Sequence, residues 1–261
     1  MTFALLDWLG ESRNLEFILE GFLINLEIAV VAIVLSLIVG LLLALLRLSR
    51  RRVLSVGTGL WIDTFRNLPL IFLLLFLALW MPGEWREWWT EAVPDWAPAA
   101  YRSGFVLAAF LGLTLYNSAV LAEIMRAGIL SLPRGQQEAA AALGMTHRQQ
   151  MRHVVLPQGL RRMVPATVGQ LITLNKDTTL VSIIAIQEVM RNGRTVAATS
   201  GNPFVGGGEP APILEVFLVI GVLFVAVNFT LSRLSRRLEV RERRRTGTTT
   251  ARVSGVEDQI V

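Results

Sequence analysis

Apolar residues gather in five long runs along the chain, and polar or charged stretches separate these runs. The runs lie at about 23–46, 60–80, 104–124, 165–186 and 213–231, and polar residues interrupt the fourth. An α-helix needs about 20 apolar residues to cross the hydrocarbon core of a bilayer. The pattern therefore predicts an all-α membrane protein with five transmembrane helices.

The distribution of charge between the runs predicts the orientation of the chain. Acidic residues concentrate before the first run and between the second and third. Arginines follow the first, third and fifth runs, among them Arg47, Arg50, Arg51, Arg52, Arg126, Arg134, Arg148, Arg152, Arg161, Arg162, Arg233, Arg236 and Arg237. Short arginine-rich loops are typical of the cytoplasmic side. We therefore expect the N-terminus outside and the C-terminus in the cytoplasm.

This orientation divides the chain into three parts. Residues 1–22 form an external N-terminal segment, and residues 23–232 form the transmembrane domain, whose cytoplasmic loop covers 126–164. Residues 233–261 are rich in arginine and threonine, which is typical of a solvated, disordered cytoplasmic tail.

Composition agrees with a membrane protein and excludes several kinds of site. Hydrophobic residues make up 53% and charged residues 17% of the chain, against roughly 25% charged in a soluble domain. Cysteine is absent and there are two histidines, so we predict no metal site and no catalytic residue. A phosphate-binding loop needs Gly-Lys-Ser/Thr, but Lys176, the one lysine, follows Asn175. The net charge of +5 is explained by topology, and we expect no nucleic acid partner.

The loop between the third and fourth runs has a distinctive pattern, PRGQQEAAAALGMTHRQQMRHVVLP, at residues 133–157. Its alanines favour a helix, and Gly144 is a suitable C-terminal cap. Thr146 and Gln149 then predict a capping box that starts a second helix, which Pro157 ends or kinks. Two interpretations are open at this point: a narrow surface that enters a groove on another protein, or an ordinary amphipathic helix pair.

The segment resembles the EAA loop of ATP-binding-cassette (ABC) importer permeases. That loop reads Glu-Ala-Ala, three residues, Gly, nine residues and Ile-x-Leu-Pro; here Glu138, Ala139, Ala140, Gly144, Leu156 and Pro157 match, and Val154 replaces isoleucine. The stretches 65–76, 116–144 and 175–183 are similar to the polar amino acid branch of the family. Together these resemblances cover about 63–189, roughly half of the chain.

The resemblance implies a type I ABC importer (MetI-like) permease fold in a prokaryotic inner or plasma membrane. It implies that the six matching residues couple this subunit to a cytoplasmic ABC ATPase dimer, which binds the ATP and Mg²⁺. A second permease subunit, identical or different, would complete the pathway through the bilayer. An extracytoplasmic solute-binding protein would deliver a polar amino acid, of the glutamate, glutamine or aspartate type.

Polar residues at membrane depth are candidates for the solute pathway or for gating. Each charge near the middle of a span costs about 2.5–3.5 kcal/mol on insertion scales, so Lys176 and Asp177 need partners or a break in the helix. The candidate set is Asn175, Lys176, Asp177, Thr178, Asn117 and Glu123. A structural ion pair that joins two spans would explain Lys176 and Asp177 equally well.

Two other functional classes compete with the ABC permease. An ion-coupled secondary amino acid transporter would use Lys176 and Asp177 as an ion relay, although such carriers usually show internal repeats over more spans. A membrane scaffold would carry no solute.

The external loop near Trp85, Trp88 and Trp89 has two interpretations. It would lie in the outer leaflet as an aromatic belt, or it would dock an external protein.

Overall fold

The computed structural model describes residues 12–199 and 213–246, and these residues form a bundle of helices without a strand. In chain order the elements are α2 (Ser12–Arg47), α3 (Arg52–Asn67), α4 (Leu70–Trp80), α5 (Gly83–Ala92), η2 (Ala99–Arg102), α6 (Phe105–Leu130), α7 (Arg134–Ala142), α8 (His147–Gln150), the π-helical turn η3 (Met151–Val155), α9 (Leu156–Asp177), η4 (Thr178–Ile184), α10 (Val189–Thr199) and α11 (Ile213–Thr246). Residues 1–11, 200–212 and 247–261 lie outside the described residues. Residues 233–246 of the predicted disordered tail are the helical end of α11, so the prediction of disorder is wrong for that part.

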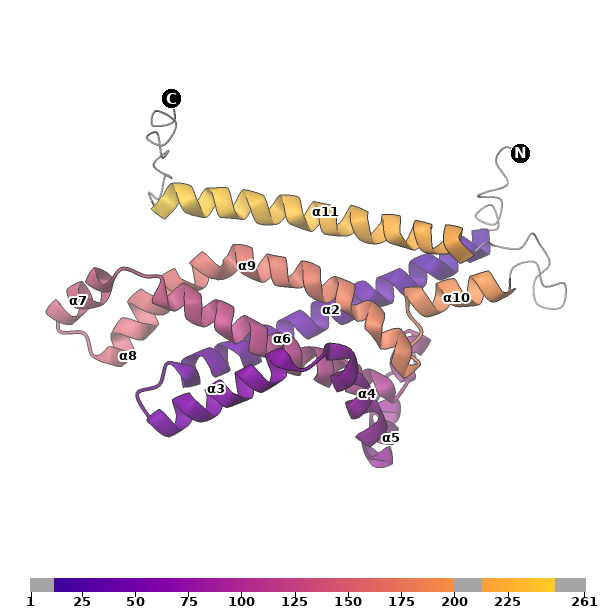
Figure 1. The fold of residues 1–261 in the computed structure, drawn as a ribbon, viewed down its shortest axis with the longest axis horizontal. Coiled ribbons are helices and arrows are strands. Elements are labelled where there is room, and N and C mark those ends of the chain that lie inside the picture. The colour runs from indigo at the N-terminus through magenta and orange to yellow at the C-terminus, as the bar shows by residue number, and fades with distance from the viewer. Residues whose placement is uncertain (1–11, 200–212, 247–261) are drawn as a thin grey trace, which may run out of the picture.

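Helix α6 is the centre of the bundle. It packs against α2, α9, α4 and α3, and half of its length is buried, including Leu113, Leu121 and Met125. The long helices run along one axis, with α7 and α8 at one end and α10 near the other (Figure 1). The described start of α2 and the described end of α11 lie at opposite ends of that axis (Figure 1).

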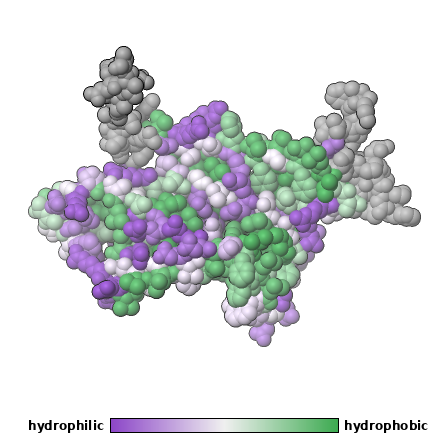
Figure 2. Space-filling model, viewed as in Figure 1, coloured by the Kyte–Doolittle hydropathy of each residue, from purple (hydrophilic) through white to green (hydrophobic). Residues whose placement is uncertain are grey.

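Three helices, α2, α6 and α11, are long and apolar enough to cross a membrane. They match the first, third and fifth predicted spans. Large apolar side chains stay exposed on α11 and also on α4: Leu214 on α11 is 69% exposed, and Leu79 on α4 is 83% exposed. Hydrophobic surface covers the first half of α11 and the region of α4 (Figure 2), as expected when lipid is the solvent.

The second predicted span, 60–80, is not one continuous helix, which corrects the sequence prediction. The chain breaks between α3 and α4, and the two helices meet at a bend of 100°. Pro69 explains the break, because its ring disfavours helical backbone in the residue before it. Leu68 accordingly has an extended conformation, with φ −76° and ψ 134°.

The fourth predicted span is helical, but its bounds differ from the prediction. Helix α9 begins at Leu156, well before the predicted start at 165, and keeps Pro165 within it. After Asp177 the chain tightens into the 3₁₀ helix η4. Helix α9 is not among the helices that are apolar enough to span a membrane alone.

Glycines allow α6 and α9 to cross with their backbones in contact. A Cβ atom added to Gly128 would lie 2.9 Å from the carbonyl oxygen of Gly159, and one added to Gly159 would lie 3.0 Å from the Cα of Ile129. Small residues are what permits such close approach between membrane helices. The crossing lies at the base of the α7–α8 loop and holds that loop to α6.

Gly159→Ala should therefore destabilise the protein by about 1–3 kcal/mol, because the added methyl group overpacks the crossing. The matched control is Gly221→Ala on α11, where an added Cβ meets no atom within 4 Å. Thermal unfolding of the detergent-solubilised protein, followed by tryptophan fluorescence, measures both. Equal midpoints for the two variants would contradict the crossing.

Candidate functional site

The loop between α6 and α9 turns sharply at Gly144, which has a φ of +75°. The amide of Gly144 donates to the carbonyl of Ala141 at 2.9 Å, and the amide of Met145 donates to the carbonyl of Ala140 at 3.2 Å. This pair of bonds is a Schellman motif, which satisfies the last carbonyls of α7 and requires left-handed backbone at the glycine. The predicted role of Gly144 as a cap is confirmed.

The second helix of the loop begins with the predicted capping box. The amide of Gln149 donates to Oγ1 of Thr146 at 3.4 Å, and the amide of Thr146 donates to Oε1 of Gln149 at 2.8 Å. Pro157 does not end this helix, contrary to one of the sequence-based alternatives. Helix α8 passes through the π turn η3 into α9 without a break, and the wider turn gives the proline ring room next to the preceding carbonyls.

Most of the predicted coupling residues lie on the surface of the loop. Glu138, Ala139, Gly144 and Pro157 are exposed, and Leu156 is half-buried. Ala140 is 3% exposed and packs inside the loop, so its contribution is to the shape of the loop. Glu138 lies in the second turn of α7, since that helix already begins at Arg134.

Sequence reasoning missed Leu143, which is 83% exposed at the tip of the loop. A large apolar side chain that projects from an otherwise small-residue helix is a feature of protein–protein contacts. The available signal was its place between the alanine run and Gly144, where a helix ends and its last side chain has no neighbour on the next turn.

Two further contacts hold the loop in place. Nε2 of Gln158 on α9 donates to Oε1 of Gln136 on α7 at 3.2 Å. Nη1 of Arg162 on α9 donates to the carbonyl of Ser131 at the end of α6 at 2.7 Å. The two parts of the predicted coupling motif, Glu138–Gly144 and Leu156–Pro157, therefore belong to one compact unit.

Three of the predicted pathway residues are buried and join helices. Asn117 on α6 accepts a bond from Nε2 of Gln170 on α9 at 2.7 Å. Asn175 on α9 donates to Oδ1 of Asn228 on α11 at 3.0 Å. Thr178 accepts a bond from Asn25 on α2 at 3.1 Å. Gln170 and Asn228 were not predicted; their signal was a single amide side chain within an apolar run.

Lys176 and Asp177 differ from these three residues. Lys176 is exposed and Asp177 is half-buried. Among residues 13–198 and 213–241, whose side chains the structure describes, ion pairs join Arg102 to Asp95 and Arg126 to Glu123, and neither Lys176 nor Asp177 takes part in them. Of the two interpretations open from sequence, the structural ion pair has no support within this part of the chain.

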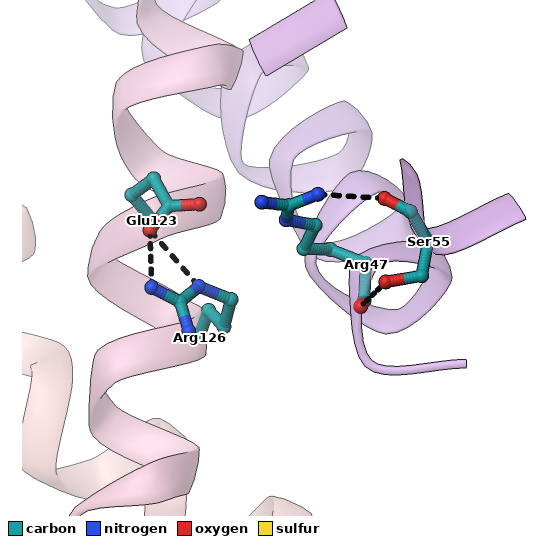
Figure 3. Close-up of polar contacts among 4 residues, drawn as sticks. All are labelled: Arg47, Ser55, Glu123 and Arg126. Atoms are coloured by element: carbon teal, nitrogen blue, oxygen red, sulfur yellow. Dashed lines mark hydrogen bonds and ion pairs between the residues drawn. The ribbon is translucent and has the colours of Figure 1, made fainter. Parts of the chain in front are cut away.

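Glu123 is held by its own helix. Oε2 of Glu123 lies 2.8 Å from Nη2 of Arg126, one turn later on α6, and Figure 3 shows this pair beside the end of α2. There Arg47 donates to the carbonyl of Ser55 at 2.8 Å, and Ser55 donates back to the carbonyl of Arg47 at 2.7 Å (Figure 3). These bonds close the turn between α2 and α3.

The tryptophans of the external loop differ in exposure. Trp85 and Trp88 on α5 are 55% and 61% exposed, as an interfacial helix or a docking surface requires. Trp89 packs inward, where its Nε1 donates to the carbonyl of Tyr101 at 2.8 Å. Burial, together with the hydrogen bond that the Tyr101 hydroxyl donates to Glu27, raises the pKa of that hydroxyl above its ordinary value.

Comparison with known proteins places this helical arrangement in a family. Residues 25–244 match the family described as "Binding-protein-dependent transport system inner membrane component". The chain belongs to this family. It is therefore a multi-pass inner-membrane protein and a transport component, and the ion-coupled carrier is not supported.

The relatives cover nearly the whole chain. The probable glutamine ABC transporter permease protein GlnP of Bacillus subtilis (strain 168) is 34% identical over 91% of this chain and 100% of its own length. The glutamate/aspartate import permease protein GltK of Escherichia coli O157:H7 is 32% identical over 90% of this chain and 97% of its own length.

Solved structures show the same fold. One chain from a crystal structure of an amino acid ABC transporter with histidines superposes with a TM-score of 0.71, at 24% identity, over 92% of this chain and 100% of that chain. A chain of the inward-facing MetNI methionine ABC transporter gives a TM-score of 0.61 at 21% identity, over 87% of this chain and 98% of that chain. The predicted MetI-like permease fold is confirmed.

Gly144→Ala should loosen the loop, because left-handed backbone costs a non-glycine residue about 1–2 kcal/mol. Asparagine tolerates this conformation better, so Gly144→Asn is the matched control. The rate of tryptic cleavage after the exposed Arg148 measures loop opening. We expect faster cleavage in the alanine variant than in the asparagine variant, and equal rates would contradict a requirement for positive φ.

Proposed function

We propose that this chain is the permease subunit of an ABC importer for a polar amino acid, with glutamate, glutamine or aspartate as the favoured substrate class. The names of its relatives support that class, since GlnP is described as a glutamine permease and GltK as a glutamate/aspartate permease. A separate ATPase dimer supplies the energy, a second permease subunit completes the pathway, and a solute-binding protein delivers the amino acid.

One observation carries the coupling role of the loop. The α7–Gly144–α8 elbow is exposed, and α8 continues through η3 and α9 as one helical rod to Lys176 and Asp177. A partner that moves the elbow therefore changes the orientation of the helix that ends at Lys176 and Asp177. Glu138, Ala139, Leu143 and Gly144 offer that partner a small-residue surface with one apolar projection, whereas Ala140 shapes the surface from within.

The topology that fits this function has five crossings. They are α2, the bent pair α3–α4, α6, the rod α9–η4 and α11, with the N-terminus outside and the C-terminus in the cytoplasm. The arginine-rich ends of α2 and α11 lie at the same end of the bundle as α7 and α8 (Figure 1), as the positive-inside rule requires of a cytoplasmic face.

Lys176 and Asp177 are the residues that we assign to the pathway. They lie at the end of α9, and neither belongs to an ion pair within the described part of the chain. Charges at membrane depth that have no structural partner usually face water or a second subunit. Asn117, Asn175 and Thr178 support the pathway indirectly, because they hold α9 against α6, α11 and α2.

Reconstitution tests the proposed function. Proteoliposomes that contain this permease and its ATPase, with the binding protein added outside, should take up labelled glutamate, glutamine or aspartate only when ATP is inside. Competition by each unlabelled amino acid then ranks the three substrates, and unlabelled arginine is the negative control. Uptake that needs no ATP and is abolished by an ionophore would contradict an ABC importer.

Glu138→Lys and Leu143→Asp should each reduce ATP-dependent uptake by at least about tenfold, which corresponds to about 1.4 kcal/mol lost at the ATPase contact. The control is Gln137→Lys, which adds a lysine on a different side of α7 from Glu138. Residue 137 is three positions before Ala140 and therefore lies on the side of Ala140. Crosslinking of the loop to the ATPase distinguishes loss of contact from loss of insertion. Normal uptake in both variants would contradict the coupling role.

A further inference from the structure

A cluster of buried polar side chains lies where the pathway helix ends, and neither the coupling motif nor the pathway explains it. Asn25, Thr178 and Glu188 are each 0% exposed, and Asn192 is 4% exposed. We call these four residues the polar lock. They come from α2, from η4, from the residue before α10 and from α10 itself.

Asn25 is the centre of the polar lock. Its Nδ2 donates to Oε2 of Glu188 at 3.0 Å and to Oγ1 of Thr178 at 3.1 Å. Its Oδ1 accepts from the amide of Val189 at 3.0 Å. One amide side chain of the first long helix thus holds residues that are 153 and 163 positions away in the sequence.

Glu188 connects the lock to the start of α10. Its Oε1 accepts from the amide of Arg191 at 2.9 Å, so its side chain caps the first turn of that helix. Both oxygens of Glu188 therefore act as acceptors. Glu188 forms none of the ion pairs found within residues 12–199 and 213–246, so hydrogen bonds hold this carboxyl group.

Close packing between α2 and α10 reinforces these bonds. Nδ2 of Asn192 donates to the carbonyl of Phe17 at 2.8 Å. A Cβ atom added to Gly21 would lie 2.7 Å from Nδ2 of Asn192 and 2.8 Å from the amide nitrogen of Val189. The two helices can approach so closely only because residue 21 is a glycine.

The polar lock lies at the opposite end of α9 from the elbow. Helix α9 has 22 residues and is therefore about 33 Å long, and it runs from the α7–α8 end toward α10 (Figure 1). The elbow is exposed, whereas the side chains of the lock are buried. Breaking a bond of Asn25 or Glu188 leaves a buried polar group unpaired, which is costly.

We propose that the polar lock is the fixed point about which the rod α8–α9 swings, and that Asn25 and Glu188 are positioning residues for transport. This inference rests on the proposed function. When the far end of the rod is held, a displacement of the elbow tilts the helix and reorients Lys176 and Asp177, which lie next to the fixed point. If that end is free, the rod shifts as a whole, Lys176 and Asp177 lose their position in the pathway, and ATP hydrolysis is no longer coupled to transport.

The chemistry of the pair allows a reciprocal test with two single variants. In Asn25→Asp, the new carboxyl group faces that of Glu188, so the amide donor is lost and two negative charges meet unless the pair binds a proton. In Glu188→Gln, either two side-chain amide groups face each other or the cap on the amide of Arg191 is lost. Each single variant therefore breaks the network at a buried position, where an unpaired polar group is costly.

The double variant, which combines Asn25→Asp with Glu188→Gln, restores the pairing. The new carboxylate on α2 accepts from the new side-chain amide at position 188 and from the backbone amide of Val189. The carbonyl oxygen of that side-chain amide still accepts from Arg191. The hydroxyl of Thr178 donates to the carbonyl of Asn175 at 2.7 Å, so the bond between positions 25 and 178 returns only if that hydroxyl turns to the carboxylate. The double variant therefore restores the contacts of position 25 with position 188 and with Val189, and it reverses the polarity of the first.

The experiment measures uptake and ATP hydrolysis in proteoliposomes of the assembled importer, with glutamate, glutamine and aspartate as labelled probes. We expect each single variant to raise the ATP hydrolysed per amino acid taken up by at least about tenfold, and the double variant to return within about threefold of wild type. The control is Ser235→Ala, which removes a hydrogen bond between α11 and the carbonyl of Pro165 on α9, and its ratio should stay at the wild-type value.

Several outcomes would overturn the proposal. If the single variants assemble and keep the wild-type ratio, or assemble poorly while the surviving complexes keep it, the lock only stabilises the fold. A double variant that assembles but stays uncoupled also refutes the pairing. Should the charged variants not assemble, Thr178→Val is decisive, since it keeps the shape and removes an acceptor from Asn25; an unchanged ratio refutes the lock. Wild-type protein without ATP-dependent uptake would instead refute the proposed function.

Discussion

Hydrocarbon cannot accept or donate a hydrogen bond, so every polar side chain that this chain carries into the membrane needs a partner within the protein or contact with a water-filled pathway. Helix α9 is the element on which this constraint acts most strongly, because it is the proposed crossing that is too polar to span alone. Its amides pair with Asn117 on α6 and Asn228 on α11, and Thr178, just beyond it, pairs with Asn25 on α2. These bonds decide which helices surround α9 and which of its faces stays open.

The same constraint explains why one face of α9 can serve transport. The buried amides of α9 hydrogen-bond to neighbouring helices, whereas Lys176 remains on the surface. A helix that is anchored on several sides but keeps a charged edge is suited to line a path for a polar solute. Its other end continues through a π turn into the elbow, so one element joins the surface that receives force and the surface that meets the solute.

Backbone contacts at glycines complete this mechanical arrangement. Gly128 and Gly159 bring α6 and α9 together at the base of the elbow, and Gly21 brings α2 and α10 together at the other end. Between these contacts α9 stays helical through Pro165, although a proline inside a helix removes a hydrogen bond and favours a bend. A helix that is continuous over this length connects movement at the elbow to the orientation of its far end.

The sequence alone determined the features that depend on neighbouring residues. The Schellman turn at Gly144 and the capping box of Thr146 and Gln149 form between residues at most five positions apart. Their pattern is local, so the glycine cap and the capping box were both predicted. The apolar runs that became α2, α6 and α11 were predicted for the same reason, and the motif from Glu138 to Pro157 identified the family. Pro69 indicated the break between α3 and α4, but the apolar run continues across this residue, so the sequence was interpreted as one span.

Only the tertiary structure decided which polar residues meet and which side chains point outward. Nothing near Asn25 in the sequence indicates that its partners are Thr178 and Glu188, because helix packing brings them together across more than half of the chain. Packing also buried Ala140 and exposed Leu143, although both belong to the same short motif. Local patterns specify helices and turns, whereas partners far apart in sequence depend on how those helices pack.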